Sequence, residues 1–89
     1  MKITTNAIAG TLESNDVLVR VSPAEGLSVE IESIVLPQFG KQIRQAVLET
    51  AQDLQVQDAA IFLQDKGANE CTIKARVETA LMRAMGASA

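Results

Sequence analysis

Few side chains in this 89-residue sequence could do chemistry unaided. Because there is no histidine, a histidine-based catalytic triad and an imidazole proton shuttle near neutral pH are excluded. Cys71 is the single cysteine, so neither an internal disulfide nor a CxxC site can form. At the start of a helix Cys71 could act as a nucleophile, since the helix dipole favours a thiolate. Without a histidine base, we expect an inert, partly buried thiol.

Two pairs of carboxylates have a spacing that could suit general acid and base work, Glu30 with Glu32 and Glu49 with Asp53. Both pairs lie on faces predicted to be exposed, so nothing indicates the burial that would keep one carboxyl protonated. The segment 65–67, Asp-Lys-Gly, lacks the GxxxxGK[ST] frame of a phosphate-binding loop and predicts a turn. We therefore expect neither catalytic side chains nor a metal site.

Ser14 offers a different kind of chemistry. It lies within Glu13-Ser14-Asn15-Asp16, four small or polar residues that favour a turn. The simplest interpretation is that the serine only helps to form this turn. A turn serine also presents an exposed hydroxyl, free of core contacts, to a modifying enzyme, and could therefore hold a carrier arm. The familiar small acidic carrier attaches its arm within an Asp-Ser-Leu tripeptide in an all-helical bundle, and this chain has no such tripeptide.

Apolar residues around the turn predict strands. Ile8–Leu12 alternates weakly and Val17–Val21 has β-branched residues at every second position, so the two segments predict a hairpin. Leu27–Glu32 alternates cleanly and predicts a third strand that is buried on one side only. Ala59–Leu63 is too short an apolar run for a typical helix and predicts a fourth strand.

From Pro37 the apolar period changes from two to about 3.6 residues, which predicts a helix, and Asn69 could cap a second helix that Gly86 ends. Residues 87–89 are expected to fray. The predicted apolar stripes are Phe39, Ile43, Val47, Ala51 and Leu54 in the first helix, and Ile73, Val77, Leu81 and Ala84 or Met85 in the second. This order predicts one α+β domain over residues 1–89, with two layers: a sheet of about four strands and two helices packed on one face.

The formal net charge of −3 lies entirely in residues 1–35, which hold two basic and five acidic residues, whereas residues 36–89 hold six of each. A solvated strand face would explain this asymmetry, and a surface that attracts basic partners is the alternative. Acidity and an aromatic content of 2% argue against a nucleic-acid surface. No stretch reaches the length of a signal peptide or of a membrane span, so we expect no membrane association and a cytoplasmic protein.

Several segments resemble one known family. The first is Ala9-Gly10-Thr11-Leu12-Glu13-Ser14-Asn15-Asp16-Val17, followed by Val19-Arg20-Val21 and Pro23. Others follow in the family's order and spacing: Gln38-Phe39-Gly40, Ile43-Arg44, Asp65-Lys66-Gly67-Ala68, Cys71 and Ala75-Arg76. Together they resemble the citrate lyase acyl carrier protein family, the gamma chain of bacterial citrate lyase. Asn69-Glu70 departs from the Leu-Asp expected before the cysteine.

The resemblance implies a carrier role in which the chain itself makes no bond. Ser14 would hold 2'-(5''-phosphoribosyl)-3'-dephospho-CoA, a phosphoribosyl dephospho-CoA arm, through a phosphodiester, and the thiol at the end of the arm would hold acetyl. The implied partners are an alpha chain that exchanges acetyl for citryl with release of acetate, a beta chain that cleaves the citryl thioester to oxaloacetate, and the transferase that installs the prosthetic group.

Under the resemblance the neighbours of Ser14 gain expected roles. Asn15 and Asp16 would complete the turn that displays the serine, and Glu13 and Asp16 would belong to an acidic surface that partner chains or the transferase recognise. Two alternatives stay open: the carrier subunit of malonate decarboxylase, which uses the same kind of prosthetic group, and an interaction module without an arm.

Overall fold

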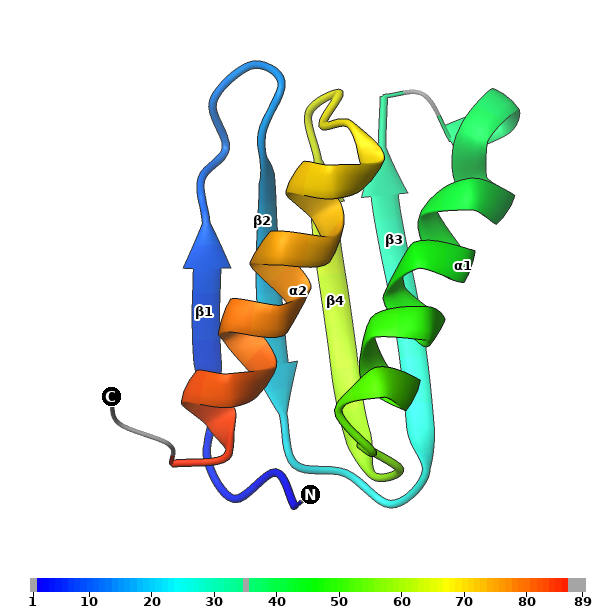
Figure 1. Ribbon diagram of the computed structural model, residues 1–89. Helices are drawn as coiled ribbons and strands as arrows, with labels where there is room; N and C mark the ends of the chain where they lie inside the picture. The colour runs from blue at the N-terminus through cyan, green and yellow to red at the C-terminus, as the bar shows by residue number, and fades with distance from the viewer. Residues whose placement is uncertain (1, 35, 87–89) are drawn as a thin grey trace.

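Four strands form one mixed sheet in the computed structural model, which describes residues 2–34 and 36–86, the side chains of 36–38 excepted (Figure 1). The elements in chain order are β1 (Ala7–Gly10), β2 (Val17–Ser22), β3 (Leu27–Ser33), α1 (Leu36–Asp53), β4 (Ala59–Asp65) and α2 (Glu70–Ala84). The spatial order of the strands is β1-β2-β4-β3. β2 pairs antiparallel with both β1 and β4, whereas β3 pairs parallel with β4.

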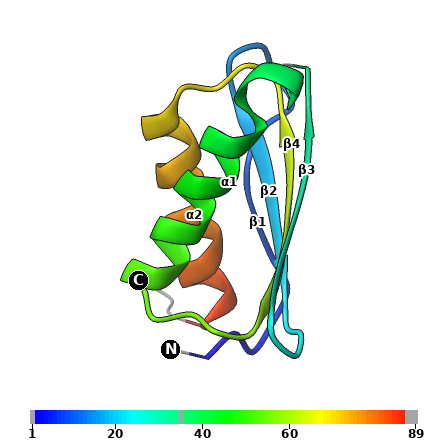
Figure 2. The ribbon, with the colours of Figure 1, turned by 90° about the vertical axis from the view of Figure 1, so that its right-hand side faces the viewer.

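Both helices cover the same face of the sheet, and the opposite face carries no helix (Figure 2). α1 makes the crossover that parallel neighbours require, since it connects β3 to β4. α2 contacts β1 and β2, and the two helices also contact each other. The predicted two-layer α+β fold, with strands and helices in the predicted order, is confirmed.

The core is aliphatic, as the scarcity of aromatic residues predicts. Alternate residues of β2 and β4 face the helices, and the predicted stripes of both helices, Phe39 excepted, pack against them. The fully buried larger side chains include Val17, Val19, Val21, Val47, Ile61, Leu63, Val77 and Leu81. This packing fixes the positions of both loops that follow β1 and β4 at the upper end of Figure 1.

Some predicted elements differ from the structure. The first strand ends at Gly10, and Leu12, predicted to lie within it, is 52% exposed in the connecting loop. The apolar face of β3 is only partly buried, because β3 is an edge strand that α1 covers incompletely; Leu27 is 38% exposed. Phe39 was expected in the buried stripe of α1 but is 47% exposed, because it lies in the first turns of the helix beside a groove.

Cys71 is exposed, which corrects the expectation of a partly buried thiol. It lies in the first turn of α2, off the stripe that buries Ile73 and Val77. Asn69 caps this helix as predicted: its side-chain oxygen accepts a 2.8 Å hydrogen bond from the Thr72 amide. The predicted fraying of residues 87–89 falls outside the described residues. Within residues 2–34 and 36–86, neither helix has the length and hydrophobicity needed to cross a bilayer.

Candidate attachment site

Ser14 lies in the loop of residues 11–16 that joins β1 to β2. The Asp16 amide donates a 3.1 Å hydrogen bond to the Glu13 carbonyl and closes a four-residue turn. Asn15, the third residue of this turn, has φ 64°, a left-handed conformation that asparagine tolerates better than most residues. Ser14 is the second residue of the turn and is exposed. Its hydroxyl forms no hydrogen bond within the part of the chain that the structure describes.

Asp16 links this turn to α2. The Arg76 guanidinium donates from Nε to Asp16 Oδ1 at 3.1 Å and from Nη2 to Oδ2 at 3.0 Å, a two-pronged ion pair. The Thr11 hydroxyl donates to Oδ2 at 2.7 Å, and the Val17 amide donates to Oδ1 at 2.7 Å. The side chain of Asp16 is only 14% exposed. The loop is therefore closed across its base by one carboxylate.

These hydrogen bonds determine the ionisation of Asp16. The Thr11 hydroxyl, then Arg76 and then the Val17 amide favour the carboxylate, and together they lower the pKa of Asp16 from its ordinary value of 3.8 to about 2. Asp16 is thus negatively charged at neutral pH, but its charge is paired with a cation of the same chain. This arrangement favours a structural role for Asp16 over the predicted role in an acidic recognition surface. Glu13 and Asn15 are exposed, so their side chains are accessible to a partner.

Backbone hydrogen bonds hold the same turn to the segment after β4. The Asn15 amide donates to the Lys66 carbonyl at 2.8 Å, and the Lys66 amide donates to the Asp16 carbonyl at 2.9 Å. They continue the β2–β4 ladder beyond the Val17–Asp65 pair. A Cβ on Gly67 would lie 3.4 Å from Asn15 Oδ1, so the two loops are in close contact.

Asp65 holds the loop of residues 66–69 in place. It is 1% exposed; its Oδ2 accepts the Ser33 hydroxyl at 2.8 Å and its Oδ1 accepts the Ala68 amide at 2.9 Å. A buried carboxylate with these donors fixes both the end of β3 and the approach to α2. From the sequence, the segment from Asp65 is expected only to form a turn, and the structural role of its carboxylate was missed.

Gly10 allows the close approach of the strands below the turn. Its φ is 92°, and a Cβ at this position would overlap the Val17 carbonyl oxygen and lie 3.3 Å from Arg76 Cδ. Any larger residue would therefore displace both the hairpin and the arginine that binds Asp16.

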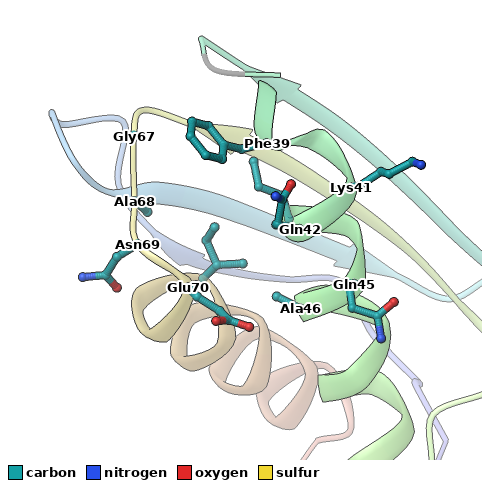
Figure 3. A pocket seen from close by; sticks show the side chains of 11 residues that line it. Phe39, Lys41, Gln42, Gln45, Ala46, Gly67, Ala68, Asn69 and Glu70 are labelled. Carbon is teal, nitrogen blue, oxygen red and sulfur yellow. The ribbon is translucent and has the colours of Figure 1, made fainter. Parts of the chain in front are cut away.

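A groove of about 740 Å³ lies between α1 and the start of α2, and residues 67–69 of the loop after β4 form one of its walls (Figure 3). We call it the α1–α2 groove. Its lining residues are Phe39, Lys41, Gln42, Ile43, Gln45, Ala46, Gly67, Ala68, Asn69, Glu70 and Ile73. Next to this groove, Lys74 Nζ of α2 lies 3.2 Å from Glu49 Oε1 of α1, so an ion pair joins the two helices. This contact raises the pKa of Lys74.

The other sequence candidates do not form a catalytic arrangement. Glu30 and Glu32 are exposed, and Glu49 pairs with Lys74. Within residues 2–34 and 36–86 no group of histidine, cysteine, aspartate or glutamate residues is placed to hold a metal ion. Thr11 and Arg76 were not assigned a role from the sequence; the Thr11–Asp16 spacing is a local signal, whereas Arg76 lies 60 residues away.

Comparisons with known proteins agree with the family resemblance seen in the sequence. The family model described as malonate decarboxylase delta subunit (MdcD) matches residues 4–84. A citrate lyase acyl carrier protein of Treponema denticola is 52% identical over 84 residues, which cover 94% of this chain and 97% of the relative. Proteins of the same name from Pectobacterium atrosepticum and Haemophilus influenzae are each 52% identical, covering 94% of this chain and 88% of each relative. The chain belongs to the citrate lyase acyl carrier protein family.

As an acyl carrier protein, the chain is a non-catalytic carrier subunit. Its fold is shared with a chain in a crystal structure of a Pseudomonas malonate decarboxylase hetero-tetramer in complex with malonate. The TM-score is 0.78 at 23% identity, with 91% of this chain and 84% of that chain covered. An acyl carrier protein needs a prosthetic arm to hold its acyl group.

Proposed function

We propose that this chain is the acyl carrier of a citrate lyase and holds 2'-(5''-phosphoribosyl)-3'-dephospho-CoA on Ser14. The observation that carries the proposal is the combination of an exposed, unbonded hydroxyl with a turn that Asp16, Arg76 and Lys66 hold in place. A modifying enzyme can reach such a hydroxyl without unfolding the chain. The comparisons support the carrier role and leave the attachment residue to experiment.

The residues around Ser14 fit a large group attached through a phosphodiester. No core residue covers the hydroxyl, and the left-handed Asn15 turns the chain sharply so that Ser14 projects at the tip. The α1–α2 groove lies on the other side of the 66–69 loop, which bonds the turn through Lys66. When attached, the group supplies a thiol that carries acetyl or citryl as a thioester.

The chain itself contributes to the reaction by positioning the acyl group. A flexible arm of this kind presents its acyl group at an effective concentration on the order of mM to any active site that the carrier can reach. We propose that these active sites belong to an alpha subunit, which transfers acyl groups, and to a beta subunit, which cleaves the citryl thioester. A transferase would install the arm, and the exposed Glu13 would contribute to its recognition.

Purification of the tagged chain from its native host tests the proposal. We expect citrate lyase alpha and beta subunits to co-purify and the mass of the chain to exceed the bare 9.5 kDa by one prosthetic group. Protein made in a host without the transferase is the control and should have the bare mass. A bare mass in the native host, with active citrate lyase present, would contradict the proposal.

A carrier role in malonate decarboxylase is the second candidate, favoured by the name of the matching family model and by the shared fold. Co-purifying subunits separate the two. Reconstitution should restore citrate cleavage to carrier-depleted citrate lyase and should not restore malonate decarboxylation. The reverse result would assign the chain to malonate decarboxylase.

A further inference from the structure

We propose that the α1–α2 groove holds the pantetheine part of the carrier's own arm between reactions. The inference rests on the proposed function, since it requires an arm on Ser14. It assigns a second role to the chain beyond attachment: reversible shelter for the segment of the arm that carries the acyl group.

One loop, residues 66–69, separates the groove from the attachment point. The Asn15 amide, one residue after Ser14, donates to the Lys66 carbonyl at 2.8 Å, and Gly67 begins the wall of the groove. A Cβ on Gly67 would lie 3.4 Å from Asn15 Oδ1, so the 66–69 loop packs directly against the turn and forms the wall between the turn and the groove. An arm that leaves Ser14 in this direction passes over this one loop and enters the groove on its far side (Figure 3).

The lining of the groove matches the chemistry of pantetheine, which has methylene and methyl groups interrupted by two amides. Phe39, which is 47% exposed, supplies the apolar surface of the groove, and the core residues Ile43 and Ile73, 4% and 2% exposed, close its floor. Phe39, Gln42 and Glu70 lie around the open space, whereas Lys41 is directed away from it (Figure 3). The Gln42 amide can pair with an amide of the arm, and the Glu70 carboxylate can accept from an amide N–H.

The charge of the groove favours binding of the pantetheine segment of the arm over binding of the nucleotide segment. The diphosphate of the arm is anionic, and Glu70 would repel it from the groove while Lys41 points elsewhere. The uncharged pantetheine meets no such repulsion. The nucleotide is therefore expected to remain near Ser14, in solvent, with the pantetheine folded back between the helices.

A weak site is sufficient for this role. Tethering places the arm at an effective concentration on the order of mM, so an intrinsic dissociation constant of about 1 mM fills the groove about half of the time. Tighter binding would reduce the fraction of arms available to the partner subunits. Weak, tethered binding thus protects the arm and still releases it.

Nuclear magnetic resonance of the arm-loaded chain tests the proposal, with loading verified by intact mass. Compared with the unmodified chain, we expect amide shifts at Gly67, Ala68 and Ile73 and at the Gln42 side chain, in addition to shifts around Ser14. Gln42→Trp fills the groove and should reduce the shifts of the other groove residues by more than half. Gln52→Trp is the matched control: it places the same exposed substitution on α1 outside the groove and should leave the shifts unchanged.

The outcomes distinguish this inference from the proposed function. If the mass shows a loaded chain but shifts are confined to residues 12–16, the groove does not hold the arm and the carrier role stands. If groove shifts appear only when purified alpha or beta subunits are added, the occupant is a partner chain and the inference is wrong. If the native-host chain carries no arm, both proposals fail.

Discussion

Two exposed loops of the same sheet are held very differently. The β2–β3 loop, residues 23–26, is tied down by the Asp58 carboxylate, which accepts from the Gly26 amide at 2.8 Å, and by the Ala59 amide, which donates to the Gly26 carbonyl at 2.9 Å. The β1–β2 loop, residues 11–16, has two backbone hydrogen bonds to Lys66 and four to the carboxylate of Asp16. Exposure and looseness are therefore separate properties, and the loop with the candidate serine is the more firmly held.

The extra support joins the β1–β2 loop to two other elements. It comes from α2 through Arg76 and from the end of β4 through Lys66, so the position of Ser14 depends on the packing of the whole domain. Under the proposed function, a turn held in this way would present the attachment point to partner enzymes at one fixed place, which would reduce the ordering entropy that docking costs. The β2–β3 loop only has to join two strands.

Gly10→Ala should have the largest effect on this contrast. The new methyl group would overlap the Val17 carbonyl, and the left-handed φ adds strain, so we expect a loss of about 3–5 kcal/mol in unfolding free energy. A total of roughly 4–13 kcal/mol is ordinary for this length, so the variant would be close to unfolded. Urea denaturation measures the loss.

Gly26→Ala is the matched control in the other loop. Gly26 also has a positive φ, 74°, but a Cβ there would meet no atom within 4 Å, so only backbone strain remains, about 1 kcal/mol. Equal losses for the two variants would show that close packing under the β1–β2 loop is not what sets it apart.

Arg76→Leu should have the next largest effect. It removes the two-pronged ion pair while Thr11 and Val17 still bond Asp16, and because Arg76 is 41% exposed we expect a loss of only about 1–2 kcal/mol. Amide exchange at Asn15 and Lys66 should become faster than elsewhere. Arg44→Leu, which removes an exposed arginine bond to the Val29 carbonyl, is the control and should leave exchange in this loop unchanged.

Acid should weaken the β1–β2 loop selectively. The pKa of Asp16 is lowered in the folded state, so its contribution to stability is present above 3.8 and is lost as pH falls from there through about 2. We expect a loss of about 1 kcal/mol over this range, smaller than the ideal linkage value because the Arg76 partner is solvated. Thermal unfolding of the wild type and of Asp16→Asn measures it, and parallel pH profiles for the two proteins would contradict the assignment.

Asp58→Ala should have the smallest effect. It removes one exposed acceptor from the Gly26 amide, worth about 0.5–1 kcal/mol, and should alter amide exchange only in residues 23–26 and 58–59. Faster exchange at Asn15 in this variant would mean that the two loops are coupled, contrary to the separate supports described above.

The distance along the chain between contacting residues also explains what the sequence could predict. The element order, the aliphatic core and the turn at Glu13–Asp16 depend on residues close together in the chain, and all are confirmed. The Asp16–Arg76 pair joins residues 60 apart, and the sequence carries no periodic signal for such a contact. For the same reason Asp16 was expected on a recognition surface although the fold turns its carboxylate inward.

Side-chain exposure near the starts of the helices was also predicted wrongly from the sequence. Phe39 fits the spacing of the buried stripe, but it lies in the first turn of α1, where its ring is 47% exposed and lines the α1–α2 groove. Cys71 likewise lies off the buried stripe of α2. The role of Ser14 stays a prediction, since position and exposure show that it is accessible and not that it is modified.

Peptide mass spectrometry of the chain purified from its native host tests the central claim most directly. We predict that the peptide containing Ser14 carries one phosphoribosyl dephospho-CoA group and that Ser14→Ala, expressed in the same host, keeps the bare mass of 9.5 kDa. An unmodified Ser14 peptide, or an arm found on another residue and retained in Ser14→Ala, would contradict the account.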